Sequence, residues 1–184
     1  MTAPVAYVCG GGGHLDPWGS ERDDALVPNV VVTRVISAPA SQVWNVVTDL
    51  ANSAEVLSQV AAVQVLSDGD FGVGTRWRET RRMFGNEATV EMEVAAVDPG
   101  QWYDVVAEDQ SATYRSRIEL SEQGETTVLT MTFSAEGRGA VGRALGALTG
   151  PLTRGPTEKL LRGDLADIAA AAEAADEPGT ATTT

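Results

Sequence analysis

The sequence predicts an α+β fold, in which a curved antiparallel sheet of about seven strands wraps around a long C-terminal helix. A strand-like segment rich in β-branched residues comes first and precedes two short helical segments. Six more strand-like segments then follow, with short turns of the kind that join antiparallel neighbours. Beyond residue 138, the apolar residues recur at helical spacing instead.

The first strand is predicted over residues 29–37, where valine, isoleucine and threonine dominate. Pro39 suits the first position of a helix, because its missing N–H would have no partner there. Val43 and Val47 follow at helical spacing and indicate one buried face. A second short helix is expected over residues 51–58.

The six strands that follow are bounded by glycine, proline, asparagine or aspartate, which are typical turn residues. The strongest turn signal is Asp98-Pro99-Gly100. Connections of this length predict that each strand pairs antiparallel with the next. The expected strands cover residues 60–66, 74–83, 87–97, 102–107, 112–120 and 126–135.

The C-terminal part of the chain has the apolar spacing of a long helix. The apolar positions are Val141, Leu145, Leu148 and Leu152, followed by Leu161, Leu165, Ile168 and Ala172. Gly150-Pro151 and Gly155-Pro156 lie between the two runs, so the helix is expected to be kinked or split near 150–156. Its apolar stripe is expected to pack on the sheet.

Composition excludes several classes of function. The chain has 184 residues, 26 acidic against 13 basic, and a formal net charge of −13, which argues against nucleic acid as a partner. One cysteine, Cys9, and one histidine, His14, exclude a disulfide framework and a metal site built from cysteines or several histidines. With no phosphate-binding loop either, we expect no metal and no nucleotide cofactor.

We expect one domain over residues 29–175, preceded by a flexible leader (1–28) and followed by a disordered tail (176–184). The first residues lack the basic and apolar regions of a secretion signal. No apolar run reaches the roughly 18 residues that cross a bilayer, so stable membrane insertion is not expected. These features predict a cytoplasmic protein, either a monomer or a homodimer.

Three segments carry a family resemblance: residues 36–44 (Ile-Ser-Ala-Pro-Ala-Ser-Gln-Val-Trp), residues 72–79 (Gly-Val-Gly-Thr-Arg-Trp-Arg-Glu) and the glycine-rich residues 137–146. Over roughly residues 29–175 the chain resembles the START-like (SRPBCC) superfamily and, within it, the bacterial polyketide cyclase/dehydrase and lipid-transport family. The expected element order is that superfamily's helix-grip arrangement. One departure is Ala-Glu-Val-Leu at residues 54–57, where members often carry tryptophan or proline.

The resemblance implies a cavity between the concave face of the sheet and the long helix. Members of the family bind apolar or amphipathic small molecules there, including lipids, polyketides and aromatic compounds. Some members catalyse cyclisation or dehydration and others only bind, so the fold does not decide between these functions.

Alternation along the strands assigns side chains to the inner or outer face of the sheet. Pairing Met83 with Asn86 or Ala88 across the turn at 83–86 places one set of residues from that strand inside: Trp77, Glu79, Arg81 and Met83. The rest of the predicted ligand-binding set is Val90, Met92, Ser116, Ile118, Met131 and Phe133, with Leu145 and Leu148 from the helix. The predicted outer face pairs Arg76, Arg78 and Arg82 with Glu91 and Glu93.

Glu79 and Arg81 are therefore expected inside, where charges are costly unless they are paired. Two interpretations stay open: a structural ion pair near the cavity mouth, or an acid/base or oxyanion pair for a ligand carbonyl. Tyr114 and Ser116 add inward hydroxyls, which would either orient a ligand or bond to the backbone as core residues.

The sequence thus favours a protein that binds an apolar or aromatic small molecule, lipid-like or polyketide-like. The alternative is a polyketide aromatase/cyclase or dehydratase, a lyase or isomerase in which Arg81 polarises a carbonyl and Glu79 or Tyr114 moves protons. A second alternative is a toxin-like or regulatory protein-interaction module, which would need an exposed apolar patch.

Overall fold

The structure, a computed structural model, describes residues 30–83, 85–109, 112–137 and 139–175, with side chains described for all of these except 83 and 139–153. The expected leader (1–28) and the expected tail (176–184) therefore lie outside the described residues. No helix in the part of the chain that is described is long and apolar enough to cross a membrane.

The first strand and the helical connection come close to their predicted positions. Strand β1 spans Val30–Ile36 and helix α1 spans Ala40–Thr48, with Pro39 as its N-cap residue rather than its first helical residue. The predicted second helix is shorter than expected and consists of a 3-10 turn, η1 (Leu50–Asn52), and a single helical turn, α2 (Ser53–Val56).

The side chain of Asp49 caps the start of this helical segment. Its carboxylate accepts hydrogen bonds from the backbone N–H of Asn52 (3.4 Å) and from Asn52 Nδ2 (2.7 Å). The Ser53 hydroxyl donates to the backbone carbonyl of Asp49 at 3.1 Å. These bonds hold the start of the segment, and it ends at Val56 because the backbone of Leu57 is extended.

Seven antiparallel strands form a single curved sheet in the order β1-β7-β6-β5-β4-β3-β2, which confirms the predicted α+β fold. Strands that follow one another from β2 to β7 are neighbours, and β1 closes the order beside β7. The strands after β1 are β2 (Val60–Val65), β3 (Arg76–Met83), β4 (Asn86–Asp98), β5 (Trp102–Glu108), β6 (Ala112–Gln123) and β7 (Thr126–Gly137).

The β3–β4 register decides which charged residues face inward. Met83 pairs with Asn86, one of the two pairings that the sequence predicts. Trp77 then stands opposite Met92, and Glu79 stands opposite Val90. Directly paired residues share a face of the sheet, so this register places the side chains of Trp77 and Glu79 among apolar partners.

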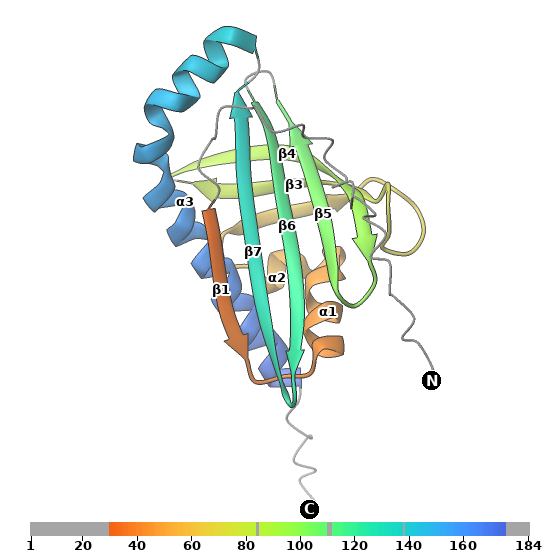
Figure 1. Cartoon of the computed structure of the whole chain (residues 1–184). Coiled ribbons are helices and arrows are strands. Elements are labelled where there is room, and N and C mark those ends of the chain that lie inside the picture. The colour runs from red at the N-terminus through yellow and green to blue at the C-terminus, as the bar shows by residue number, and fades with distance from the viewer. Residues whose placement is uncertain (1–29, 84, 110–111, 138, 176–184) are drawn as a thin grey trace, which may run out of the picture.

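Helix α3 (Gly139–Ala175) is continuous, so of the two predicted alternatives, kinked or split, the helix is not split. Figure 1 shows that the helix changes direction along its course, and that its later part lies along the hollow side of the sheet. Pro151 and Pro156 have no backbone N–H to donate within the helix, and their rings crowd the preceding turn. A bend in the helix relieves this crowding. The predicted apolar run from Val141 to Leu152 falls on side chains outside those described.

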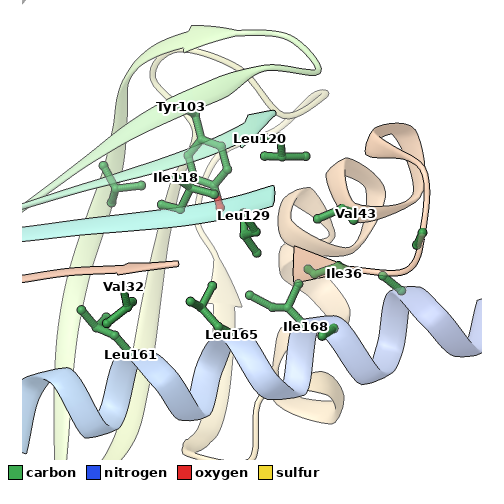
Figure 2. Close-up of a cluster of buried hydrophobic side chains, with 14 of the residues drawn as sticks. Val32, Ile36, Val43, Tyr103, Ile118, Leu120, Leu129, Leu161, Leu165 and Ile168 are labelled. Carbon is green, nitrogen blue, oxygen red and sulfur yellow. The ribbon is translucent and has the colours of Figure 1, made fainter. Parts of the chain in front are cut away.

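The second apolar run of α3 packs into the core, as predicted. Leu161, Leu165 and Ile168 point from the helix toward the sheet and toward α1 (Figure 2). Among the residues they meet are Val32 and Ile36 of β1. Burial of this stripe is the main apolar contact that keeps α3 on the sheet.

Two carboxylates of α3 also bond to the connection between β1 and β2. Asp167 Oδ2 accepts from both the backbone N–H (2.8 Å) and the hydroxyl (2.7 Å) of Ser58. Glu173 Oε1 accepts from the backbone N–H of Ser37 at 2.9 Å. These bonds fix the end of α3 against the loops at one end of the sheet.

Replacing Leu165 with alanine is expected to lower the free energy of unfolding by about 2–5 kcal/mol, because the side chain is 1% exposed and its removal leaves a cavity. The matched control is Leu66→Ala, where the side chain is 38% exposed and the loss should stay below about 1 kcal/mol. Chemical denaturation measures both, and equal losses would contradict the packing described for α3.

Candidate functional site

A cavity of about 430 Å³ lies between the inner face of the sheet, the α1–η1–α2 connection and α3. This volume falls in the usual range of ligand pockets, about 300–1,000 Å³. The connection contributes Val46, Val47, Leu50, Ser53, Val56 and Leu57 to its wall. Helix α3 contributes Thr157, Leu160, Leu161, Asp164 and Ile168.

The structure places most of the sequence-predicted site residues in the cavity wall. From the ligand-binding set these are Trp77, Val90, Met92, Ser116, Ile118, Met131 and Phe133. The three candidate catalytic residues Glu79, Arg81 and Tyr114 also line it. The side chains of Met83, Leu145 and Leu148 lie outside those the structure describes.

Three charged side chains meet in the wall, and we call them the Glu79–Arg81–Asp164 cluster. Arg81 Nε donates to Glu79 Oε1 on the same strand, and Arg81 Nη1 donates to Asp164 Oδ2 of α3 at 2.7 Å. Glu79 is 6% exposed and Asp164 1% exposed, whereas the Arg81 side chain is 25% exposed. One cation is thus shared by two buried carboxylates, one from the sheet and one from the helix.

The cluster shifts the ionisation of its members. Burial raises the pKa of Asp164, Arg81 partly offsets this effect, and the nearby carboxylates Glu79 and Asp167 add to the rise. Burial alone would lower the pKa of Arg81, but Asp164 and Glu79 outweigh it and the pKa is raised. The guanidinium therefore stays charged, while Asp164 keeps its proton to higher pH than an exposed aspartate.

Two buried polar atoms in the cavity wall have no hydrogen-bond partner among the described residues: Trp77 Nε1 and Asp164 Oδ1. Arg81 Nη2 likewise makes no hydrogen bond to a residue that the structure describes. Trp77 Nε1 and Asp164 Oδ1 have almost no accessible surface, whereas the Arg81 side chain is 25% exposed. Arg81 is therefore the member of the cluster that a bound molecule could reach for a hydrogen bond.

Tyr103 anchors the connection to the sheet above the cavity. Its hydroxyl donates to the backbone carbonyl of Val47 at 3.0 Å, and its ring packs edge-on against Trp44 and Phe71, with centroids 5.9 and 5.0 Å away. Burial, with a contribution from Glu79, raises the pKa of Tyr103, so its phenol remains a neutral donor.

Tyr114 does not join the Glu79–Arg81–Asp164 cluster. It lies on β6, three strands from β3 in the sheet order. Its hydroxyl donates to Asp109 Oδ2 at 2.9 Å, and its ring stacks on Phe133 with centroids 6.2 Å apart. The prediction left open a ligand role or a backbone bond, and the hydroxyl bonds to a carboxylate that also lines the cavity.

The outer face of the sheet carries the cross-strand ion pairs that the sequence predicts. Their side chains are exposed, so each pair adds little stability. Arg82 pairs with Glu87 rather than with the predicted Glu91 or Glu93. A further pair, Asp104 with Arg117 (2.6 Å), was not predicted, and its Asp104 is buried. The pairs between β3 and β4 are Arg76–Glu91, Arg76–Glu93 (3.8 Å), Arg78–Glu91 (3.3 Å) and Arg82–Glu87 (3.9 Å).

Sequence analysis did not single out Asp164 or Tyr103. Asp164 carried a usable signal, because it stands three residues after Leu161 and four before Ile168, on the buried stripe of the helix. Tyr103 alternates with Val105 and Ala107 on the inner face of β5. No group of three His, Cys, Asp or Glu side chains within the described ranges is placed to hold a metal ion.

We expect the free energy of unfolding of the wild type, relative to Asp164→Asn, to fall as the pH rises above about 4. The raised pKa of Asp164 means that the native protein keeps a proton that the unfolded chain releases. The stabilisation is therefore complete at low pH and is lost as the pH passes the native pKa. Denaturant titrations at several pH values measure the difference, and a difference that rises with pH would contradict this account.

The fold is shared with solved structures of low sequence identity. The protein TTHA0849 of Thermus thermophilus is 21% identical (TM-score 0.65; 81% of this chain and 99% of that one). The Zhui aromatase/cyclase of a Streptomyces species is 19% identical (TM-score 0.64; 79% of this chain and 93% of that one). A START superfamily protein of Mycobacterium smegmatis is 17% identical (TM-score 0.59; 80% of this chain and 95% of that one). At these identities the similarity shows the fold alone.

No curated protein matches the sequence. A sequence model of the family described as polyketide cyclase / dehydrase and lipid transport matches residues 27–173, which is most of the chain. This match agrees with the helix-grip arrangement of the sheet and α3. The chain belongs to the polyketide cyclase / dehydrase and lipid transport family.

Proposed function

We propose that the protein binds an apolar or aromatic small molecule, lipid-like or polyketide-like, between the sheet and α3. The observation that carries this proposal is the cavity of about 430 Å³, whose described lining is mostly aliphatic and aromatic. Burying apolar ligand surface in such a space is favourable by roughly 25 cal/mol per Å². Family membership supports the same class of ligand.

The lining combines adaptable and rigid parts. Met92 and Met131 are flexible side chains that can adjust to different ligand shapes. Tyr114 stacked on Phe133 offers a flat aromatic surface, which suits a planar ligand. Polar residues are a minority of the lining, and those of the Glu79–Arg81–Asp164 cluster would help to fix the orientation of the ligand.

The test is native mass spectrometry of freshly purified protein, followed by denaturing extraction of any molecule that co-purifies. We expect a stoichiometric apolar or aromatic ligand, or, from a stripped protein, binding of the uncharged dye Nile red. If nothing co-purifies and neither the dye nor a panel of fatty acids and polyaromatic ketones binds, the proposal is wrong.

A matched pair of variants locates the binding to the cavity. Val105 lines the cavity and its neighbour Val106 does not. Val105→Phe fills part of the space and is expected to weaken Nile red binding at least tenfold, whereas Val106→Phe should change it less than twofold. Fluorescence titration measures both affinities, and an equal effect of the two variants would place the dye elsewhere.

Catalysis is the second candidate function, favoured by the charged cluster in a mostly apolar wall. In an aldol cyclisation, Arg81 Nη2 would donate to the acceptor carbonyl while Glu79 takes the proton from the attacking carbon. A carbon–carbon bond forms, the carbonyl oxygen becomes a hydroxyl, and its later loss with a neighbouring proton releases water. Glu79 would then pass the proton that it has taken to that oxygen, so that the step balances.

Arg81→Met is expected to lower the rate of cyclisation of a synthetic poly-β-ketone at least a hundredfold, because it removes the group that polarises the carbonyl. The matched control is Arg78→Met on the outer face of the same strand, which should keep the rate. Ultraviolet absorbance of the aromatic product measures the rate. If the wild type does no better than buffer, the protein is a binding protein rather than an enzyme.

A further inference from the structure

The charges of the cavity wall are unbalanced. Arg81 is the one cationic side chain among the described residues that line the cavity. Glu79 and Asp164 both bond to it, through Nε and Nη1 respectively. Whether or not Asp164 holds a proton, the charge of Arg81 is balanced by at least the Glu79 carboxylate, so the cluster carries no net positive charge.

A ligand carboxylate would therefore find no counter-charge in the described wall. To reach Arg81 it would have to approach two carboxyl groups that already bond to the same guanidinium, in a site where burial strengthens repulsion between like charges. Displacing either carboxylate would leave that group buried without a partner, which is strongly unfavourable.

An uncharged polar group meets the opposite situation. The Arg81 side chain is 25% exposed, and its Nη2 makes no hydrogen bond to a residue that the structure describes. A carbonyl or hydroxyl oxygen of a ligand could accept from this Nη2. Such a contact leaves both carboxyl groups bonded to Arg81 and adds no charge.

We propose that the cavity selects uncharged ligands bearing hydroxyl or carbonyl groups and rejects carboxylates of the same shape, through the Glu79–Arg81–Asp164 cluster. The inference rests on the proposed function, because it names the chemical class that the cavity takes. It favours phenols, alcohols and ketones over free fatty acids and aromatic acids.

The test uses displacement of Nile red by three compounds with the same ring system at pH 7. These are 2-naphthol, which is uncharged, 2-naphthoic acid, which is ionised, and methyl 2-naphthoate, in which the same carboxyl is neutral. We expect 2-naphthol and the ester to bind at least tenfold more tightly than the acid, which corresponds to about 1.4 kcal/mol.

Variants assign the preference to the cluster. Glu79→Gln and Asp164→Asn each remove one carboxylate while keeping a side chain that can bond to Arg81, so each should raise the affinity for 2-naphthoic acid at least threefold. The double variant leaves Arg81 without a carboxylate partner and should reverse the preference. The matched control is Glu158→Gln, on the same helix and outside the cavity, which should leave the preference unchanged.

The outcomes separate the two proposals. If Nile red does not bind at all, the proposed function fails. If Nile red binds but the acid competes as well as 2-naphthol, the inference is overturned while the proposed function stands. A preference for 2-naphthol over the acid that persists unchanged in every folded variant would also overturn the inference. If no variant folds, the comparison of 2-naphthoic acid with its methyl ester on the wild type decides whether the cavity rejects the carboxylate.

Discussion

The packing of α3 into the hollow of the sheet is the contact on which the rest of the structure depends. The helix buries Leu161, Leu165 and Ile168 against β1 and the core, and this contact closes one side of the molecule. The hollow is wider than one helix, so packing leaves a space beside it rather than a solid core. Stability and the cavity thus come from the same interaction.

The Arg81–Asp164 bond joins the two sides of that cavity. It links residues 83 positions apart, one on the sheet's inner face and one on the helix. Burying the pair costs desolvation energy, which an apolar pair would not. The protein nevertheless places all three charges of the cluster against the cavity, where their polarity can act on a ligand.

Sequence reasoning located Glu79 and Arg81 because strand alternation has a period of two and the turn before Asn86 left few registers. It did not single out Asp164, although this residue stands on the buried stripe of the helix. The helical period does not show which strand the stripe will face, so nothing linked Asp164 to Arg81. The second short helix was predicted to reach residue 58, but it ends at Val56 because the backbone of Leu57 is extended. The volume of the cavity depends on the curvature of the sheet, which no local pattern encodes.

The α1–η1–α2 connection has a further consequence. It joins strands at opposite edges of the sheet and, in passing, contributes six residues to the cavity wall. None of those six belongs to the sheet, so their side chains can be exchanged without disturbing a strand register. Evolution can therefore change the molecule that this protein recognises by substitutions in one short segment, while the sheet and α3 preserve the fold.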